Sequence, residues 1–182
     1  MRVVAGTARS LILKTIEGMD TRPTTDRIKE TLFNMLTGYV QDAKFLDLFA
    51  GSGGIGIEAL SRGASECTFI ENNPKAVACI KDNLTHTKLE NRGKVLKYDA
   101  ISYVQGLNNI DYDVIFMDPP YNKDLEKNVL TVLAGKEFLT DTLIVVEASI
   151  EEDFSYVEQL GFDIVKDKRY KSNKHIFLQK RD

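Results

Sequence analysis

Apolar residues follow two different spacings along this chain. Short apolar runs that suit buried strands occur at residues 44–49, 66–71, 94–98, 112–117 and 142–147. Stretches with helical spacing lie between or after them, at about residues 54–62, 74–86, 100–107 and 123–134. Strands that alternate with helices form a parallel sheet that is covered by helices on both faces. The pattern therefore predicts an α/β fold with a mostly parallel sheet.

The C-terminal part breaks this alternation. A helix is expected at residues 151–160, followed by two apolar runs at Phe162–Val165 and Lys174–Leu178. The linker between the two runs, residues 166–173, is too short to hold a crossover helix. We therefore expect the last two strands to be antiparallel.

The N-terminal part also stands outside the alternation. Residues 2–5 and 11–14 flank a turn at Gly6–Ser10, which predicts a small β hairpin. An amphipathic helix should follow, with Thr25 or Asp26 as its N-cap. We expect this extension to precede the main fold rather than to belong to its alternating pattern.

The composition is that of an ordinary globular chain, with 182 residues, 43% hydrophobic and 28% charged. No apolar run approaches the ~18 residues of a membrane span, and the N-terminus lacks the apolar core of a secretory signal. Cys67 and Cys79 have neither disulfide nor zinc spacing. These features predict a cytoplasmic protein with no metal and no membrane contact.

Charge is distributed unevenly along the sequence. The net charge of −3 combines +2 in residues 1–40, −10 in residues 41–165 and +5 in residues 166–182. Basic ends on an acidic body are typical of a localised site for a polyanion. Solvated termini explain the same pattern equally well. Charge alone leaves both readings open.

A glycine-rich loop follows the first strand of the alternation. Glycines at 51, 53 and 56 match the spacing G-x-G-x-x-G and permit close backbone approach to a ligand. Glu71 ends the second strand, 20 residues after Gly51, where an acid can hold ribose hydroxyls. The spacing predicts a nucleoside cofactor. The loop reads Asp47-Leu48-Phe49-Ala50-Gly51-Ser52-Gly53-Gly54-Ile55-Gly56.

Two cofactors fit such a loop. NAD would place its pyrophosphate at the helix N-terminus, whereas S-adenosylmethionine carries an ammonium and a sulfonium. Asp47 favours S-adenosylmethionine, because its carboxylate attracts a cation and repels a pyrophosphate. Asp99 follows the third strand, where it either accepts from the adenine amino group or caps the next helix.

The sequence Asp118-Pro119-Pro120-Tyr121 follows the fourth strand. The prolines lack N–H donors, so the carbonyl of Pro119 is free to accept from a substrate. With the Asp118 carboxylate it makes a pair of acceptors, and the Tyr121 ring offers a stacking surface. This combination suits an exocyclic amine on a nucleobase. A plain Pro-Pro turn at a strand end is the alternative reading.

These motifs together resemble the class I S-adenosylmethionine-dependent methyltransferases that act on amino groups. Further strings extend the likeness over nearly the whole chain and resemble the RsmD family of bacterial 16S ribosomal RNA (guanine-N2)-methyltransferases. Two mild departures are Tyr121, where phenylalanine is common, and the Gly54-Ile55 pair in the loop. The strings are Arg2-Val3-Val4-Ala5-Gly6, Arg22-Pro23-Thr24-Thr25-Asp26-Arg27, Glu30-Thr31-Leu32-Phe33-Asn34 and Glu58-Ala59-Leu60-Ser61-Arg62-Gly63-Ala64.

The resemblance implies a Rossmann-like fold with a seven-stranded, mostly parallel sheet and an antiparallel C-terminal strand. It implies one domain over residues 1–182, with residues 1–40 contacting substrate and residues 41–182 forming the catalytic core. A monomer that acts on 16S ribosomal RNA in an assembled or assembling small subunit is expected. The implied catalytic residues are Asp118, Pro119, Pro120 and Tyr121. The implied S-adenosylmethionine site comprises Asp47, Phe49, Ala50, Gly51, Ser52, Gly53, Glu71, Asn72, Asp99 and Ala100. Candidate RNA contacts are Arg2, Arg9, Lys14 and Arg22.

Other functions remain open on the residues alone. The Asp-Pro-Pro-Tyr motif tolerates adenine N6 or cytosine N4 as the amine, in RNA or DNA. An NAD-binding oxidoreductase would explain the glycine loop without explaining that motif. A non-catalytic RNA-binding module would not need acids at three successive strand ends.

Overall fold

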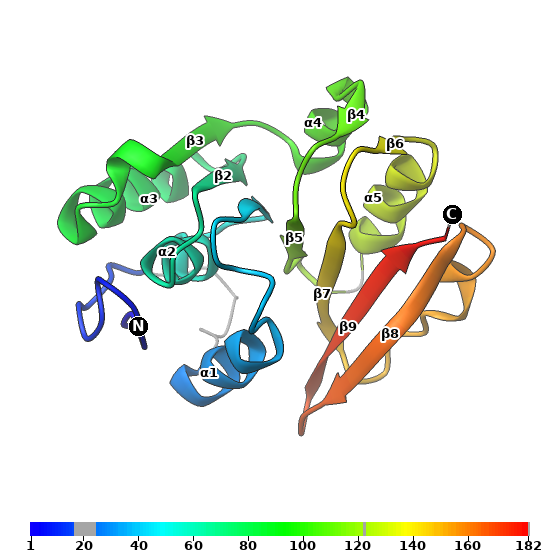
Figure 1. The fold of residues 1–182 in the computed structure, drawn as a ribbon, viewed down its shortest axis with the longest axis horizontal. Coiled ribbons are helices and arrows are strands. Elements are labelled where there is room, and N and C mark those ends of the chain that lie inside the picture. The colour runs from blue at the N-terminus through cyan, green and yellow to red at the C-terminus, as the bar shows by residue number, and fades with distance from the viewer. Residues whose placement is uncertain (17–24, 122, 182) are drawn as a thin grey trace.

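The structure is a computed structural model that describes residues 1–16, 25–121 and 123–181. Its described part contains a seven-stranded sheet in the order β3-β2-β1-β5-β7-β9-β8 (Figure 1). The strands are β1 (Lys44–Leu48), β2 (Glu66–Glu71), β3 (Gly93–Lys97), β5 (Val114–Met117), β7 (Leu143–Ser149), β8 (Phe162–Arg169) and β9 (Asn173–Lys180). A second, two-stranded parallel sheet pairs β4 (Asn109–Ile110) with β6 (Glu137–Phe138).

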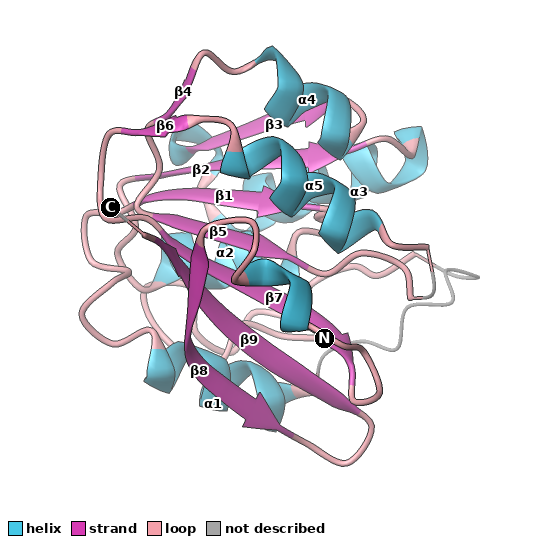
Figure 2. Ribbon diagram, turned by 90° about the vertical axis from the view of Figure 1, so that its right-hand side faces the viewer, coloured by secondary structure: helices cyan, strands magenta, loops and turns pink. Residues whose placement is uncertain are grey.

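The expected fold class is confirmed. The first five strands of the large sheet run parallel, and only β9 runs against its neighbours β7 and β8 (Figure 2). Strands β1, β5 and β7 are almost entirely buried, as parallel strands covered on both faces must be. Among the described residues no helix is long and apolar enough to cross a membrane.

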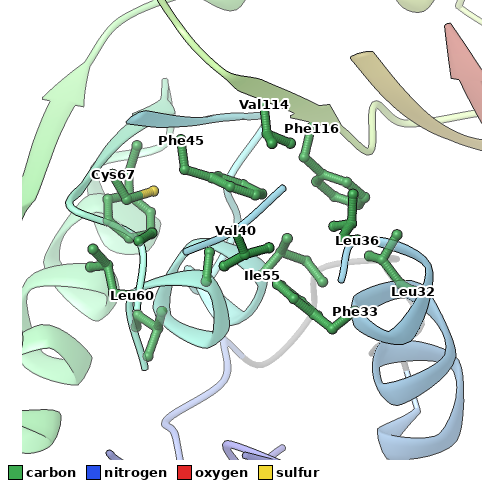
Figure 3. Packing of buried hydrophobic residues seen from close by; sticks show 14 of the residues in the cluster. Leu32, Phe33, Leu36, Val40, Phe45, Ile55, Leu60, Cys67, Val114 and Phe116 are labelled. Carbon is green, nitrogen blue, oxygen red and sulfur yellow. The ribbon is translucent and has the colours of Figure 1, made fainter. Parts of the chain in front are cut away.

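Helices cover the two faces of the sheet and divide the core. One apolar cluster lies under α1 (Asp26–Met35), α2 (Gly54–Ser61) and α3 (Pro74–Thr87), and we call this side the α1 face. The other cluster lies under α4 (Ala100–Gly106) and α5 (Leu125–Ala134), and we call it the α5 face. Figure 3 shows Phe45 and Phe116 extending from neighbouring strands toward the helices of the α1 face.

The sequence-based boundaries of several elements need correction. The helix expected at 151–160 is reduced to a short 3-10 turn at Ser155–Val157. Asp153 accepts hydrogen bonds from both the backbone N–H and the hydroxyl of Ser155, and such local bonds compete with helix formation. The last two strands extend into the predicted linker, to Arg169 and from Asn173. Another short 3-10 turn lies at Glu90–Arg92.

The predicted N-terminal hairpin is also shorter than expected. Arg2 and Ile12 form an isolated antiparallel bridge, and the bonds Val3 N–H to Leu11 O (2.9 Å) and Leu13 N–H to Met1 O (2.9 Å) flank it. The following helix is confirmed, because Thr25 caps α1 by accepting from the backbone N–H of Ile28.

Buried polar groups attach this N-terminal segment to α2. The carboxylate of Glu58 accepts from the backbone N–H groups of Val4 (2.9 Å) and Ala5 (3.0 Å), and it lies 3.3 Å from the buried ammonium of Lys29. Lys29 in turn donates to the carbonyl of Arg2. Burial lowers the pKa of Lys29, and the Glu58 charge opposes that effect. The segment is therefore part of the packed structure.

We predict that Gly6→Ala destabilises the fold much more than Gly38→Ala. Both glycines have positive φ, +84° and +90°, so each substitution should cost about 1–2 kcal/mol of backbone strain. A Cβ at Gly6 would also lie 1.8 Å from the carbonyl oxygen of Ser61, whereas one at Gly38 meets nothing within 4 Å. We expect a further ~1–3 kcal/mol for overpacking at Gly6. Urea unfolding of both variants measures the difference. Equal losses of unfolding free energy would contradict the close packing of the N-terminal segment against α2.

Candidate active site

Acidic side chains gather where the parallel strands end. The chain runs from β1 outward to β3 and then returns to β5 on the other side of β1. Ligands bind in the crevice at such a switch point, beyond the carboxyl ends of the strands. Asp47 lies near the end of β1, Glu71 ends β2 and Asp118 directly follows β5. Glu147 lies on β7 at the level of Asp118, because Met117 pairs with Val146.

The loop after β1 leaves the sheet abruptly. Phe49 has a φ of +60°, a conformation that costs a non-glycine residue about 1–2 kcal/mol. Gly51 and Gly53 also have positive φ, +57° and +82°. A Cβ at Gly51 would meet no atom within 4 Å, so this part of the backbone faces open space. Ala50, Gly51 and Ser52 are half-buried, which leaves the loop accessible to a ligand.

Asp47 lies beneath this loop and is 2% exposed. Its carboxylate accepts from the backbone N–H of Gly56 in the first turn of α2, at 3.0 Å. Gly56 is required there, because a Cβ would lie 2.3 Å from the ring of Phe69. Burial raises the pKa of Asp47 to about 7, against the lowering effect of the Gly56 bond and with a smaller raising effect from Glu71. The side chain is thus poised to change charge near neutrality.

Glu71 holds the loop from the neighbouring strand. One carboxylate oxygen accepts from the backbone N–H of Gly51 and the other from that of Asn73, both at 2.9 Å. The structure therefore confirms that Glu71 and the glycine loop lie together. Each oxygen retains a lone pair that can accept from a ligand hydroxyl. Asn72 is exposed beside it.

Asp99 caps α4, because its Oδ1 accepts from the backbone N–H of Ser102 at 2.8 Å. This is the capping role that the sequence left open. The side chain is exposed, so its other oxygen remains available to a ligand. Ala100 forms the first turn of the same helix and is buried. A role for either residue in cofactor binding stays a prediction.

Asp118 and the following residues form the second side of the crevice. Asp118 is half-buried, Pro119 is buried, and the Tyr121 side chain is 45% exposed. Burial raises the pKa of Asp118 well above its usual value, and the charges of Glu147 and Asp47 raise it further. The same burial, with Asp118 and Glu147, raises the pKa of Tyr121 to about 12. Several carboxyl groups thus repel one another in a poorly hydrated space.

Sequence reasoning missed the polar group behind Asp118. The Glu147 carboxylate accepts from Asn173 Nδ2 at 2.9 Å and lies 3.1 Å from His175 Nε2. His175 is fully buried, and its Nδ1 lies 3.1 Å from the hydroxyl of Tyr170. One neutral tautomer satisfies both contacts, with Nε2 donating and Nδ1 accepting. The available signal for Glu147 was an acid at the end of the fifth predicted strand, residues 142–147.

The structure describes three of the four predicted RNA-contact residues, and two of them form ion pairs within the chain. Arg2 pairs with Asp26 at 2.6 Å, and Lys14 pairs with Asp82 at 2.8 Å. Arg9 is exposed, and Arg22 lies outside the described residues. Two of the four expected cations are therefore already compensated by an acid.

The N-terminal segment nevertheless reaches the glycine loop. Asn83 of α3 accepts from the backbone N–H of Lys14 (2.8 Å) and donates to the carbonyls of Lys14 and Ser52, both at 3.0 Å.

The described part of the structure brings the predicted site residues together around one crevice. Asp47, the glycine loop and Glu71 lie on one side of this crevice, and Asp118 through Tyr121 lie on the other.

Comparisons with known proteins identify the family to which the chain belongs. A family model described as "Conserved hypothetical protein 95" matches residues 1–179. Ribosomal RNA small subunit methyltransferase D of Haemophilus influenzae is 34% identical over 171 residues, which are 92% of this chain and 88% of that protein.

Solved structures share the fold. Escherichia coli yhhF superposes with a TM-score of 0.87 at 32% identity and covers 100% of this chain and 98% of its own. The 16S rRNA N2 G1207 methyltransferase RsmC of Thermus thermophilus, solved with AdoMet and guanosine, gives a TM-score of 0.70 at 20% identity. That match covers 91% of this chain and 45% of RsmC, and at this identity it shows the fold alone.

We predict that Asp47→Asn stabilises the ligand-free protein at pH 8 but not at pH 4. The folded-state pKa of about 7 lies above the unfolded value near 4, so the native state binds the extra proton between these limits. Wild-type stability should fall as pH rises through this window, by at most ~4 kcal/mol from this group. Thermal or urea unfolding across pH 4–8 measures the difference between the two proteins. A difference that is constant with pH would contradict the assignment.

Proposed function

The chain belongs to the conserved hypothetical protein 95 family, the RsmD family of ribosomal RNA small subunit methyltransferases, and on this premise we propose its donor, target atom and site residues. It transfers a methyl group from S-adenosylmethionine to the exocyclic N2 amine of a guanine in 16S ribosomal RNA. Residues 41–182 form the catalytic part, and residues 1–40 contribute to substrate contact. The observation that carries the proposal is the cluster of carboxyl groups at the β1/β5 switch point.

This cluster favours a cationic ligand. Burial raises the cost of ionising Asp47 and Asp118, and the charges of Glu147 and Asp47 add to that cost at Asp118. A ligand with an ammonium and a sulfonium lowers that cost. The pyrophosphate of NAD would increase it, and the electrostatics therefore support S-adenosylmethionine over NAD.

The residues around the loop fit the rest of that cofactor. The backbone at Gly51 faces open space, and Glu71 has a free lone pair on each oxygen for the ribose hydroxyls. Asp47 and the loop from Phe49 to Gly53 would hold the methionine end. Asn72, Asp99 and Ala100 would border the adenine. When bound, S-adenosylmethionine supplies an electrophilic methyl group.

Asp118 and Pro119 would perform the orienting step. Two acceptors, the Asp118 carboxylate and the Pro119 carbonyl, bind the two N–H groups of the amine and turn its lone pair toward the methyl group. Orientation of this kind can contribute up to ~7–11 kcal/mol to lowering a barrier. Methyl transfer would leave a positive charge on N2, and this cationic nitrogen is strongly acidic. Burial raises the pKa of Asp118, so its carboxylate is a better acceptor for the proton that N2 loses.

Tyr121 would hold the target base. Its half-exposed ring stands beside Asp118, where a base that has left its stack can lie against it. The orienting pair also accommodates adenine N6 or cytosine N4, so the choice of guanine rests on the family. Product identity is therefore the deciding measurement.

We predict that small subunits lacking the modification become methylated by the wild-type protein with S-adenosylmethionine, and that nucleoside analysis finds N2-methylguanosine. Asp118→Asn should reduce turnover more than tenfold, or by over ~1.4 kcal/mol of barrier, while cofactor affinity in a calorimetric titration stays unchanged. N6-methyladenosine or N4-methylcytidine as the product would refute the target atom. A protein that binds NAD and does not bind S-adenosylmethionine in such titrations would refute the whole proposal.

We predict that Tyr121→Phe and Tyr121→Ala separate stacking from the phenol hydroxyl. The phenylalanine variant keeps the ring and should retain kcat/KM within about threefold. The alanine variant loses a stacking contribution of ~1–3 kcal/mol, so its kcat/KM should fall roughly 5- to 160-fold. Equal losses in the two variants would assign the role of Tyr121 to its hydroxyl instead of its ring.

A further inference from the structure

The edge strand β8 carries different charges on its two faces. Lys166 pairs with Phe177 and Lys168 with His175, and these partners belong to the α1 face. Asp167 pairs with Ile176 and Arg169 with Lys174 on the α5 face. No strand flanks the outer edge of β8 within the described sheet, and its residues from Asp163 to Arg169 are all exposed. Both faces are thus open to a partner.

Only the α1 face of this strand presents uncompensated positive charge. Arg169 on the other face pairs with Asp167 at 3.1 Å. Lys166 and Lys168 form no ion pair with any acid in the described part of the chain. On the α5 side, Asp124, Glu126 and Glu152 bring carboxylate oxygens within 4.8 Å of one another. A polyanion would be repelled there and attracted to the opposite face.

An aromatic ring accompanies the two lysines. Tyr170 is half-buried and directed to the α1 face, because its hydroxyl contacts the buried His175. The ammonium of Lys168 lies 5.9 Å from the centre of its ring. Lys171 is exposed at the tip of the same hairpin. Cations interleaved with an aromatic ring are typical of single-stranded nucleic-acid surfaces.

The same residues lie level with the candidate active site. Lys168 pairs with His175, His175 with Glu147, and Glu147 lies beside Asp118 one residue beyond the Met117–Val146 pair. β8 runs in the same direction as β5, so the hairpin tip lies at the edge of the sheet where β5 ends (Figure 2). Three strand spacings separate Lys168 from Asp118 in this row, or about 14 Å.

We propose that the α1 face of the β8–β9 hairpin, formed by Lys166, Lys168, Tyr170 and Lys171, is a docking surface for the RNA strand that flanks the target nucleotide. This proposal deepens the proposed function and rests on RNA being the substrate. The lysines contact phosphates, and the row from Lys168 to Asp118 sets the direction in which the strand enters the crevice. An acidic protein partner would suit the lysines but gives no reason for their alignment with Asp118.

The test compares adjacent positions on opposite faces of one strand. Lys166→Ala/Lys168→Ala removes the two strand lysines, and Arg169→Ala removes a neighbouring cation from the other face as the matched control. Fluorescence anisotropy with a single-stranded oligoribonucleotide gives the affinity at several salt concentrations. The double variant should reduce the slope of log affinity against log salt by about 1.4, for two phosphate contacts at ~0.7 each. The control should leave the slope unchanged.

Methyl transfer to small subunits provides the second readout. The double variant should raise KM roughly tenfold at moderate salt with kcat unchanged, and titration with S-adenosylmethionine verifies its fold. Wild-type slope and KM in the double variant would overturn the proposal, as would an equal effect of Arg169→Ala or a loss of affinity that is independent of salt. If the wild-type protein binds RNA but methylates no subunit, the proposed function fails, and the salt slopes still decide whether the hairpin binds RNA.

Discussion

Burial of carboxyl groups at the ends of parallel strands, to which repulsion between them adds, is the constraint on which this structure depends. A parallel sheet places the carboxyl ends of β1, β2, β5 and β7 at one edge, and each delivers an acid there. Backbone N–H groups offset part of the cost, at Asp47 through Gly56 and at Glu71 through Gly51 and Asn73. Asp118 has less compensation, which is reflected in its strongly raised pKa. Such a site favours a cationic ligand, because a nearby positive charge would lower the cost of ionising these acids.

The N-terminal segment packs against the α1 face and contacts the glycine loop at this edge of the sheet. Val3, Ala8 and Leu13 are buried in the same cluster as the strands of the α1 face, and Glu58 and Ser61 satisfy the backbone of the segment. Asn83 then joins Lys14 to the carbonyl of Ser52 in the glycine loop. This segment is therefore joined to the glycine loop by direct hydrogen bonds. Deleting the segment would expose core residues to water, so such a deletion would not isolate an effect on substrate binding.

The sequence was sufficient for the features that depend on local pattern. The five parallel strands, the glycine loop and the nearby Glu71 follow from periodicity and spacing, and the structure places them as expected. The prediction was wrong where local hydrogen bonds compete with a helix. At residues 151–160 the bonds between Asp153 and Ser155 replace most of the expected helix. Features that depend on pairing across the sheet were inaccessible. His175 carries no signal in the sequence, and only the register of β7 with β9 brings it to Glu147. The same holds for Lys166 and Lys168, which share a face because they are two residues apart, and the bulge after Ile164 sets which face that is.

A net charge of −3 is compatible with an RNA substrate because the two charge regions are separated in space. Salt at physiological strength screens exposed charges beyond about 8 Å. The row from Asp118 to Lys168 spans about 14 Å, so the acids of the crevice do not cancel the lysines at the sheet edge. Burial adds to the separation, because Asp47 is buried in the crevice whereas Lys166 and Lys168 face water. The sheet thus carries its buried acids and its exposed lysines in separate regions, and the register of its edge strand, rather than the total charge, determines which face the lysines occupy.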